Sequence, residues 1–269
     1  MINIWNTLLF HPLLNILVGF TRLTGNLGWS IISLTLFLRL IMTPVILPSL
    51  RLGKKMQELA PELAKLKEKF KDDKAGLLTA QTQLYKQHGA SPASGCLPQV
   101  IQLLVLIALF NALNFVIRGN GDLVSRLNPI LYNFNRVSEN FKPNHRFLYL
   151  DMAKPDVFKI PNIPVPLPGL FLLLSAATQF LSSKMMAPEV AREKKIAAKT
   201  ESSTDDTMVE VQQQMLYLFP LMTLLIGFQF PSGLVLYWLT FSFVSAIQQY
   251  YATGWGGLTP WIKKLGLVK

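Results

Sequence analysis

The chain has 269 residues, of which 51% are hydrophobic and 15% are charged, whereas about a quarter of the residues of a typical soluble domain are charged. This composition excludes an ordinary soluble enzyme and makes the bilayer the first solvent to consider. Lys and Arg outnumber Asp and Glu by 26 to 15. The basic excess lies in the polar segments, where it orients membrane spans and attracts anionic headgroups. Ribosomal RNA is an alternative target of the same charge.

Residues 1–26 are predicted to form a helix that lies in the membrane interface. The segment is apolar, but His11, Pro12 and Asn15 interrupt it, and Trp5 suits the depth of the headgroups. A sixth membrane span is the alternative. The first 21 residues contain no Lys or Arg, so we expect no cleaved signal peptide.

Five segments are long and apolar enough to be predicted as membrane spans. A spanning helix needs about 20 mostly apolar residues, because each adds about 1.5 Å across a hydrocarbon core of about 30 Å. The last three segments are short, which suggests local thinning of the bilayer or hydrated helix ends. The turn between the fourth and the fifth is so short that these two must be antiparallel neighbours. The predicted spans are residues 27–50, 97–117, 167–183, 215–230 and 233–251.

The first polar connection, residues 51–96, is predicted to be a helical hairpin. Residues 71–76 break its helical pattern, so the two arms should fold back on each other. A solvated amphipathic linker is the alternative. Apolar residues recur at helical spacing on both sides of the break, namely Leu59, Leu63, Leu66 and Phe70 before it and Leu77, Leu84 and Tyr85 after it.

Lysines concentrate on this hairpin and form a candidate surface for partners. Their other interpretation is a solvated face that binds nothing. The candidates are Lys65, Lys67, Lys69, Lys71 and Lys74.

The remaining connections fix the predicted orientation. The polar segments 51–96 and 184–214 and the tail 252–269 hold nine, five and three Lys and Arg, while the long loop 118–166 holds seven. Cytoplasmic loops carry the excess of Lys and Arg. We therefore predict a multi-pass protein of the bacterial inner membrane, with the N-terminus outside, the C-terminus in the cytoplasm and loop 118–166 outside.

Arg39 is the one Lys, Arg, His, Asp or Glu inside any predicted span. It lies near the middle of span 27–50, where an arginine costs about 2.5 to 3.5 kcal/mol on insertion scales. Neutral polar residues recur in the other spans and could line a water-filled recess, where the cation would attract acidic residues of a passing polypeptide. The alternative is that Arg39 bonds backbone carbonyls and hydroxyls at the centre of a helix bundle.

No motif for covalent chemistry is present. The three histidines are scattered, there is a single cysteine, and no spacing typical of a metalloprotease or a serine hydrolase occurs. We therefore expect neither an enzyme nor a cofactor nor a metal site, and we expect no DNA binding.

Four ordered motifs resemble the YidC-type membrane protein insertases and their mitochondrial Oxa and chloroplast Albino relatives. The resemblance covers most of the chain, in a minimal form without the large outer domain of some members. The motifs are Gly25–Ile32 leading to Leu38–Leu40 and Thr43–Pro44, then Leu84–Lys86 with Gly95–Pro98 and Gln102, then Thr178–Met185, and finally Phe230–Trp238.

The resemblance implies an all-α integral membrane fold in which five transmembrane helices surround a hydrophilic groove. Carried over by position, Arg39 is the groove cation, Gln102, Gln179 and Trp238 line the groove, and the hairpin is a mobile cytoplasmic element. The implied function is insertion and folding of nascent membrane proteins, alone or with the Sec translocon. The ribosome and the signal recognition particle pathway are further expected partners. The alternatives are an anion transporter or channel that uses Arg39, and an assembly scaffold for a translocon.

Overall fold

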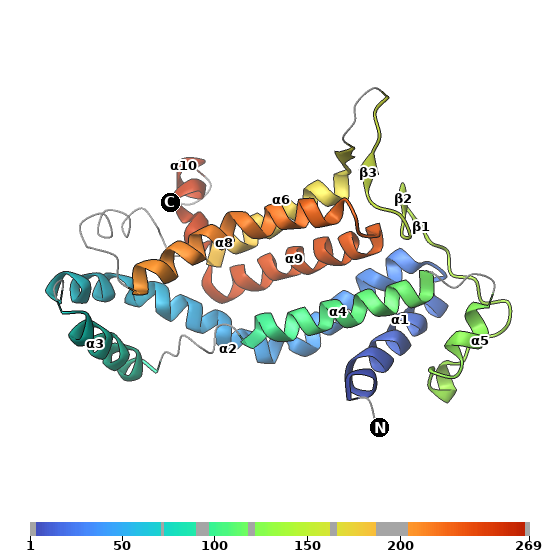
Figure 1. The fold of residues 1–269 in the computed structure, drawn as a ribbon, viewed down its shortest axis with the longest axis horizontal. Coiled ribbons are helices and arrows are strands. Elements are labelled where there is room, and N and C mark those ends of the chain that lie inside the picture. The colour runs from blue at the N-terminus through green and yellow to red at the C-terminus, as the bar shows by residue number, and fades with distance from the viewer. Residues whose placement is uncertain are drawn as a thin grey trace. The chain divides into compact units, whose positions relative to one another are not determined.

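A computed structural model describes residues 4–70, 73–89, 97–117, 122–161, 166–186 and 204–266. The described residues are mostly helical, and the helices and strands are labelled in Figure 1. The helical content agrees with the predicted all-α class of membrane protein. The longer helices are α1 (His11–Thr24, after the π-helical turn Asn6–Phe10), α2 (Leu27–Lys69), α3 (Lys74–Gln87), α4 (Leu97–Ile117), α6 (Leu170–Met186), α8 (Thr204–Gly227) and α9 (Ser232–Thr253).

The long loop 118–166 contains short regular elements that the sequence did not predict. Two antiparallel pairs of strands pair Phe147 with Leu150 and Phe158 with Leu167. These elements and those of the C-terminal end are α5 (Leu123–Leu127), the 3-10 turn Asn133–Asn135, β1 (Arg146–Phe147), β2 (Leu150–Asp151), β3 (Val157–Phe158), β4 (Leu167–Pro168), the 3-10 turn Gly256–Leu258 and α10 (Thr259–Lys264).

Several helix boundaries differ from the predicted span boundaries. Helix α2 does not end near Leu50 but continues to Lys69, through Pro44, Pro48 and Pro61. An interior proline removes one backbone hydrogen bond, and neighbouring groups re-satisfy the freed backbone group in membrane helices. The first predicted span and the first arm of the hairpin are therefore one helix.

Two further helices begin at residues other than the first residues of the predicted spans. Helix α6 begins at Leu170 rather than Leu167, because Leu167 and Pro168 pair with β3. Helix α8 begins at Thr204, eleven residues before the predicted start at residue 215. Much of the rest of loop 184–214 lies outside the described residues.

Three helical segments of the described chain are long and apolar enough to cross a membrane: Asn6–Thr24, Leu27–Leu52 and Val100–Ile117. Leu170–Met185 and Leu216–Gly227 are shorter apolar helices. The N-terminal segment, predicted to be interfacial, thus has the length and composition of the alternative, a sixth span.

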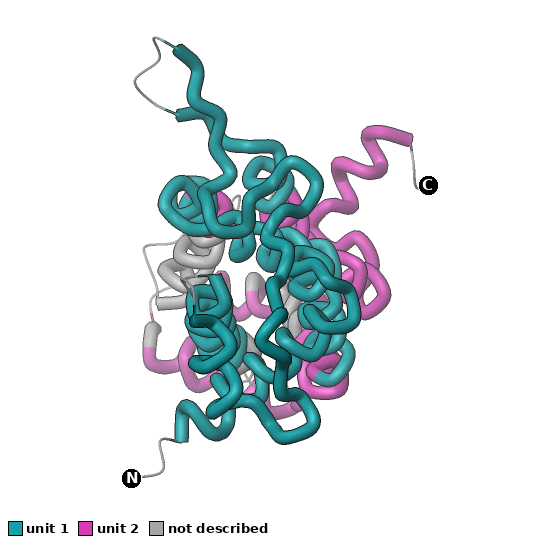
Figure 2. The backbone as a smooth tube through the Cα atoms, turned by 90° about the vertical axis from the view of Figure 1, so that its right-hand side faces the viewer, with its two compact units in different colours: residues 1–41, 100–177, 222–244 teal, residues 42–99, 178–221, 245–269 magenta. Residues whose placement is uncertain are grey.

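The chain divides into two compact units, shown in Figure 2. Unit 1 comprises residues 1–41, 100–177 and 222–244, and unit 2 comprises residues 42–99, 178–221 and 245–269.

Unit 1 has a continuous apolar core that joins helices α1, α2, α4 and α9 to the loop that follows α4. Helix spacing places the apolar residues of each helix on one face. Gly28 of α2 lies directly against Phe147 of the loop, so that a Cβ there would overlap the aromatic ring. Fully buried members from the helices and the loop include Leu14, Leu17, Ile31, Leu109, Leu127, Met152 and Tyr237.

Unit 2 has a smaller core at the hairpin, where α3 packs against the later part of α2. Leu59 and Leu84 are buried against each other's arm, with Leu63, Leu66 and Tyr85 around them. Asp73 caps α3 by accepting a hydrogen bond from the Gly76 amide at 2.9 Å, as is usual at a helix N-terminus. Residues 74–76, which the sequence places in the break of the apolar pattern, thus belong to α3.

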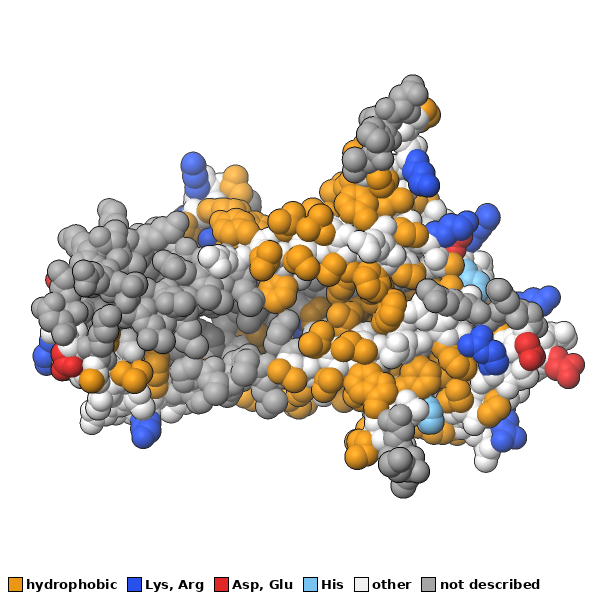
Figure 3. Space-filling view, in the orientation of Figure 1, with side chains coloured by type: hydrophobic (Ala, Val, Ile, Leu, Met, Phe, Trp, Pro, Cys, Tyr) orange, Lys and Arg blue, Asp and Glu red, His pale blue; other side chains and the backbone are white. Residues whose placement is uncertain are grey.

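Large apolar side chains are exposed along the helices of both units. Figure 3 shows them on the face of the molecule that it presents. A soluble protein would bury such a surface, whereas a membrane helix turns it toward lipid. Examples are Val100, Leu103 and Ile107 on α4, Leu173 and Leu181 on α6, Leu218 and Leu225 on α8, and Phe243 and Ile247 on α9.

Candidate functional site

Arg39 lies in an apolar, span-length part of α2 and is 6% exposed. Its guanidinium carbon lies 3.6 Å from the centroid of the Phe241 ring, and its Nη2 donates a hydrogen bond to the Phe241 carbonyl at 3.3 Å. A cation over an aromatic face is stabilised by the quadrupole of the ring. One residue of α9 therefore holds the guanidinium from two directions.

The alternative interpretation of Arg39 is a structural role in which it bonds backbone carbonyls and hydroxyls at the centre of a helix bundle. The hydrogen bond to the Phe241 carbonyl is a bond of this kind. It does not by itself decide between a structural and a substrate-binding role. Phe241 offers a neutral ring and a neutral carbonyl, and neither removes the positive charge of the guanidinium.

Helix α9 connects Arg39 to a second predicted residue, Gln102. The ring of Tyr237, one helical turn before Phe241, lies 5.8 Å from the Phe241 ring. The buried Tyr237 hydroxyl accepts a hydrogen bond from the Gln102 amide nitrogen at 2.6 Å. A continuous row of contacts across α2, α9 and α4 thus joins Arg39, Phe241, Tyr237 and Gln102.

Two other predicted groove residues, Trp238 and Gln179, are half-buried. Trp238 packs against the apolar core of unit 1, and Gln179 belongs to unit 2. On the hairpin, Lys65 and Lys69 are exposed. Lys71 lies outside the described residues, as do the side chains of Lys67 and Lys74.

The sequence did not indicate Phe241 as a site residue, and it indicated Tyr237 only as part of the motif Phe230–Trp238, either as an interfacial anchor or as a groove-lining residue. The spacing of four between these two residues does place them on one face of α9. Nothing local to that helix, however, indicates that Arg39, about 200 positions away, lies on Phe241.

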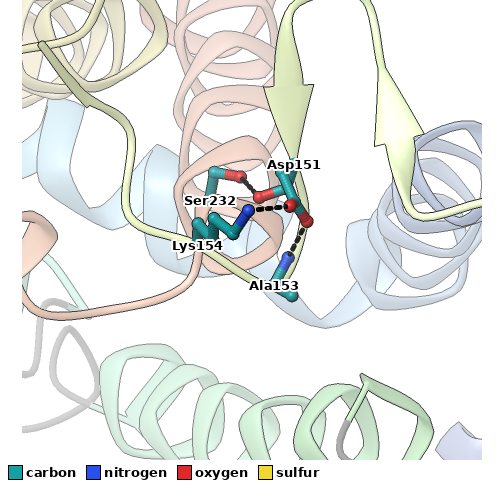
Figure 4. Close-up of polar contacts among 4 residues, drawn as sticks. All are labelled: Asp151, Ala153, Lys154 and Ser232. Carbon is teal, nitrogen blue, oxygen red and sulfur yellow. Dashed lines mark hydrogen bonds and ion pairs between the residues drawn. The ribbon is translucent and has the colours of Figure 1, made fainter.

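The long loop also binds the beginning of α9, at the motif that starts with Phe230. Figure 4 shows Ser232 donating its hydroxyl proton to the Asp151 carbonyl, while the Asp151 carboxylate accepts from Lys154 and from the Ala153 amide. The amides of Ser232 and Gly233 donate to the carbonyls of Lys154 and Met152 at 2.7 and 3.3 Å. These amides have no partner within their own helix, so the loop satisfies them.

The same loop binds the beginning of α6 through Asp156, which is 3% exposed. Its carboxylate accepts hydrogen bonds from the Leu172 amide at 2.8 Å and from the Tyr149 hydroxyl at 2.9 Å. Burial raises the pKa of Tyr149, and the hydrogen bond to Asp156 adds to that increase. The loop therefore caps two helices that begin at this end of unit 1.

The pKa values of two further groups of the loop, His145 and Asp151, differ from their ordinary values. Burial lowers the pKa of His145, partly opposed by the nearby carboxylate of Asp151. Burial raises the pKa of Asp151, but the hydrogen bonds from Lys154 and Ala153 outweigh it, so the pKa lies below its ordinary value. Both shifts favour the forms present at neutral pH, an uncharged imidazole and a charged carboxylate.

Within the described ranges, no group of three His, Cys, Asp or Glu side chains lies close enough together to hold a metal ion. The chemistry that the site offers is a held cation, a buried phenol and an amide in an apolar setting.

Comparison with known proteins places the chain in a family. Residues 19–255 match the family model described as 60Kd inner membrane protein. The membrane protein insertase YidC of Fusobacterium nucleatum is 33% identical over 230 residues, which cover 86% of this chain and 87% of that protein. The protein of the same name from Pelobacter propionicus is 33% identical over 252 residues, and that of Geobacter sulfurreducens is 30% identical over 247 residues.

The last two matches each cover 92% of this chain but only 39% and 37% of the relatives. The chain thus spans most of one relative and about two fifths of the others. Membrane insertases are not enzymes, in agreement with the absence of catalytic motifs, and the relatives and the apolar helices identify an inner-membrane protein. The chain belongs to the 60Kd inner membrane protein family, which is the family of the YidC-type membrane insertases.

Proposed function

We propose that this chain inserts nascent membrane proteins through a hydrated groove in which Arg39 receives the polar or acidic segment of the substrate. The observation that carries the proposal is the setting of Arg39, a guanidinium held on a neutral aromatic residue inside an apolar helix. Retaining a cation at this depth is costly, so a function that uses the charge accounts for it.

The physical role of the groove is to lower a desolvation barrier. A polar segment that crosses pure hydrocarbon loses its hydration, whereas one that passes along water and neutral polar groups keeps part of it. Gln102 and Ser242 are such groups in unit 1, and the resemblance adds Gln179 and Trp238. The apolar helix of the substrate then leaves into lipid, driven by its own burial at about 25 cal/mol per Å².

The proposed topology has five spans, the N-terminus outside and the C-terminus in the cytoplasm. The loop that caps α6 and α9 then lies on the outer side and closes that end of unit 1, while the hairpin lies in the cytoplasm. Its exposed Lys65 and Lys69 are proposed contacts for cytoplasmic partners. We propose the ribosome, the signal recognition particle pathway and the Sec translocon as such partners.

An insertion assay with the purified chain in proteoliposomes tests the proposal. Arg39→Ala is expected to reduce insertion of a substrate with an acidic outer segment by tenfold or more, which corresponds to about 1.4 kcal/mol. Arg39→Lys is expected to retain most of the activity, since it keeps the charge. A neutralised version of the same substrate should depend less on Arg39.

Arg126→Ala is the matched control, because the Arg126 guanidinium also lies over an aromatic ring, that of Phe115, at 4.6 Å, but in the outer loop. Equal insertion by the Arg39→Ala and Arg126→Ala variants would refute the groove role. Anion flux in the same liposomes without insertion would favour a channel. Insertion only after a translocon is added would favour a scaffold.

A further inference from the structure

A cavity of about 430 Å³ lies between the end of α1 and the segment 136–143 of the long loop. Both walls belong to unit 1. Three cationic side chains line it, those of Arg22, Arg136 and Lys142, together with the polar side chains of Ser138 and Asn140. We call it the basic pocket.

The basic pocket has an unbalanced charge. No Asp or Glu lines it, and Glu139, which belongs to the same segment, does not contribute to its wall. Arg22 donates from Nη1 to the Phe134 carbonyl at 3.2 Å and to the Asn135 amide oxygen at 3.3 Å, both neutral acceptors. In the part of the chain that the structure describes, none of the three cations forms an ion pair. Their mutual repulsion is relieved when an anion binds between them.

The walls of the pocket are fixed by hydrogen bonds that do not involve a ligand. The side chain of Asn128 brackets Val137, accepting from its amide at 2.9 Å and donating to its carbonyl at 3.0 Å. Asn135 donates to the Asn15 carbonyl at 2.7 Å. Gly25, with a φ of 67°, ends α1 and accepts from the Asn144 amide at 3.2 Å. Preorganised walls reduce the entropy that a ligand loses on binding.

Apolar side chains beside the pocket indicate what kind of anion it takes. Leu23, next to Arg22 in the chain, is 82% exposed, and Phe134, whose carbonyl holds Arg22, is 81% exposed. Figure 3 shows basic, acidic and hydrophobic side chains close together over the loop that carries α5 and β1. A free anion gains nothing from exposed apolar neighbours, whereas a phospholipid brings acyl chains together with its phosphate.

We propose that the basic pocket binds the phosphate of an anionic phospholipid headgroup, with Arg22, Arg136 and Lys142 as its ligands and with Leu23 and Phe134 against the acyl region. The site requires only that the chain is in a membrane. Its assignment to the outer leaflet rests on the orientation proposed above. A lipid bound there would link α1 to the loop that caps α6 and α9.

The test uses the full chain in detergent, titrated with short-chain phosphatidylglycerol, with phosphatidylcholine of the same chain length and with inorganic phosphate, and bound lipid is counted by native mass spectrometry. Phosphatidylglycerol is expected to bind saturably and phosphatidylcholine at least about 5-fold more weakly. The double variant Arg136→Gln/Lys142→Gln should weaken phosphatidylglycerol binding about 25-fold, since each basic residue near a membrane surface contributes about fivefold.

Two controls separate this effect from general charge and from folding. Lys159→Gln removes one exposed cation of the same loop that does not line the pocket and should leave binding unchanged. Arg136→Lys/Lys142→Arg keeps both charges and should retain most of the binding. Both residues replaced in the double variant are exposed, so its melting temperature should match that of the unmodified chain.

Unchanged phosphatidylglycerol binding by the double variant would overturn the proposal, and so would its loss in the charge-conserving swap. Inorganic phosphate that displaces phosphatidylglycerol at equal concentration would overturn the lipid assignment. None of these outcomes bears on Arg39, because insertion activity is not the readout.

Discussion

The long loop 118–166 and the hairpin are both basic connections between apolar helices, yet they pack differently. The loop contributes Leu127, Phe147 and Met152 to the core of unit 1 and caps two helices. In the described part of the hairpin, Leu59 and Leu84 form a separate small core. A connection that is part of the main core should unfold with it, whereas one with its own small core can open locally.

The largest expected effect tests this difference directly. Phe147→Ala removes a buried ring that packs edge-on against Trp29 at 5.2 Å and fills the space beside Gly28. It should destabilise the protein by about 3 to 5 kcal/mol, whereas Leu84→Ala should affect only the hairpin. Thermal unfolding in detergent measures the first, and hydrogen exchange of the hairpin amides measures the second. Equal shifts of the main transition would contradict the comparison.

A smaller effect is expected where the loop caps α6. Asp156→Ala leaves the Leu172 amide and the Tyr149 hydroxyl without their acceptor, which should cost about 1 to 3 kcal/mol. Tyr149→Phe is the control, since it removes one of these bonds and leaves the cap on the helix. Unfolding midpoints in denaturant should rank unmodified, Tyr149→Phe and Asp156→Ala from high to low, and any other order would argue against the cap.

Deletion of the hairpin tip, residues 71–76, tests whether the hairpin contributes to the main unfolding transition. It should change partner engagement while leaving the main thermal transition within about 0.5 kcal/mol, because surface changes away from a core are usually this small. Ribosome co-sedimentation and thermal unfolding together measure it. A deletion that lowers the main melting temperature would show that the hairpin is part of the main core.

The smallest effect is a dependence of the loop on pH. The pKa of His145 in the folded protein lies below its ordinary value of 6.5 because of burial. The neutral imidazole therefore makes its full contribution to the free energy of unfolding above pH 6.5. This contribution is lost as the pH falls through the folded pKa. The contribution of Asp151, whose folded pKa lies below 3.8, is lost only in stronger acid.

Hydrogen exchange at the Met152 amide, which donates to the His145 carbonyl at 2.8 Å, should therefore accelerate between pH 7 and pH 5 beyond its intrinsic rate. His145→Gln should flatten that dependence. A dependence that persists in the variant would assign it to another group.

The membrane class, the apolar helices, the hairpin and the family were determined by the sequence alone, because composition, helical spacing and local motifs act over a few turns of chain. Arg39 could be singled out for the same reason, since a charge inside an apolar run is a local anomaly. The boundaries of α2 and α6 could not, because α2 continues through its prolines and α6 begins only where β4 has paired with β3.

The contacts of Arg39 and of the long loop are visible only in the folded chain. Phe241 and Tyr237 reach Arg39 and Gln102 across more than 130 residues of chain, and the carbonyls of Met152 and Lys154 meet the amides of Gly233 and Ser232 across about 80. Such partners are selected by packing and by the need to satisfy buried polar groups. Neither requirement leaves a periodic pattern in the sequence.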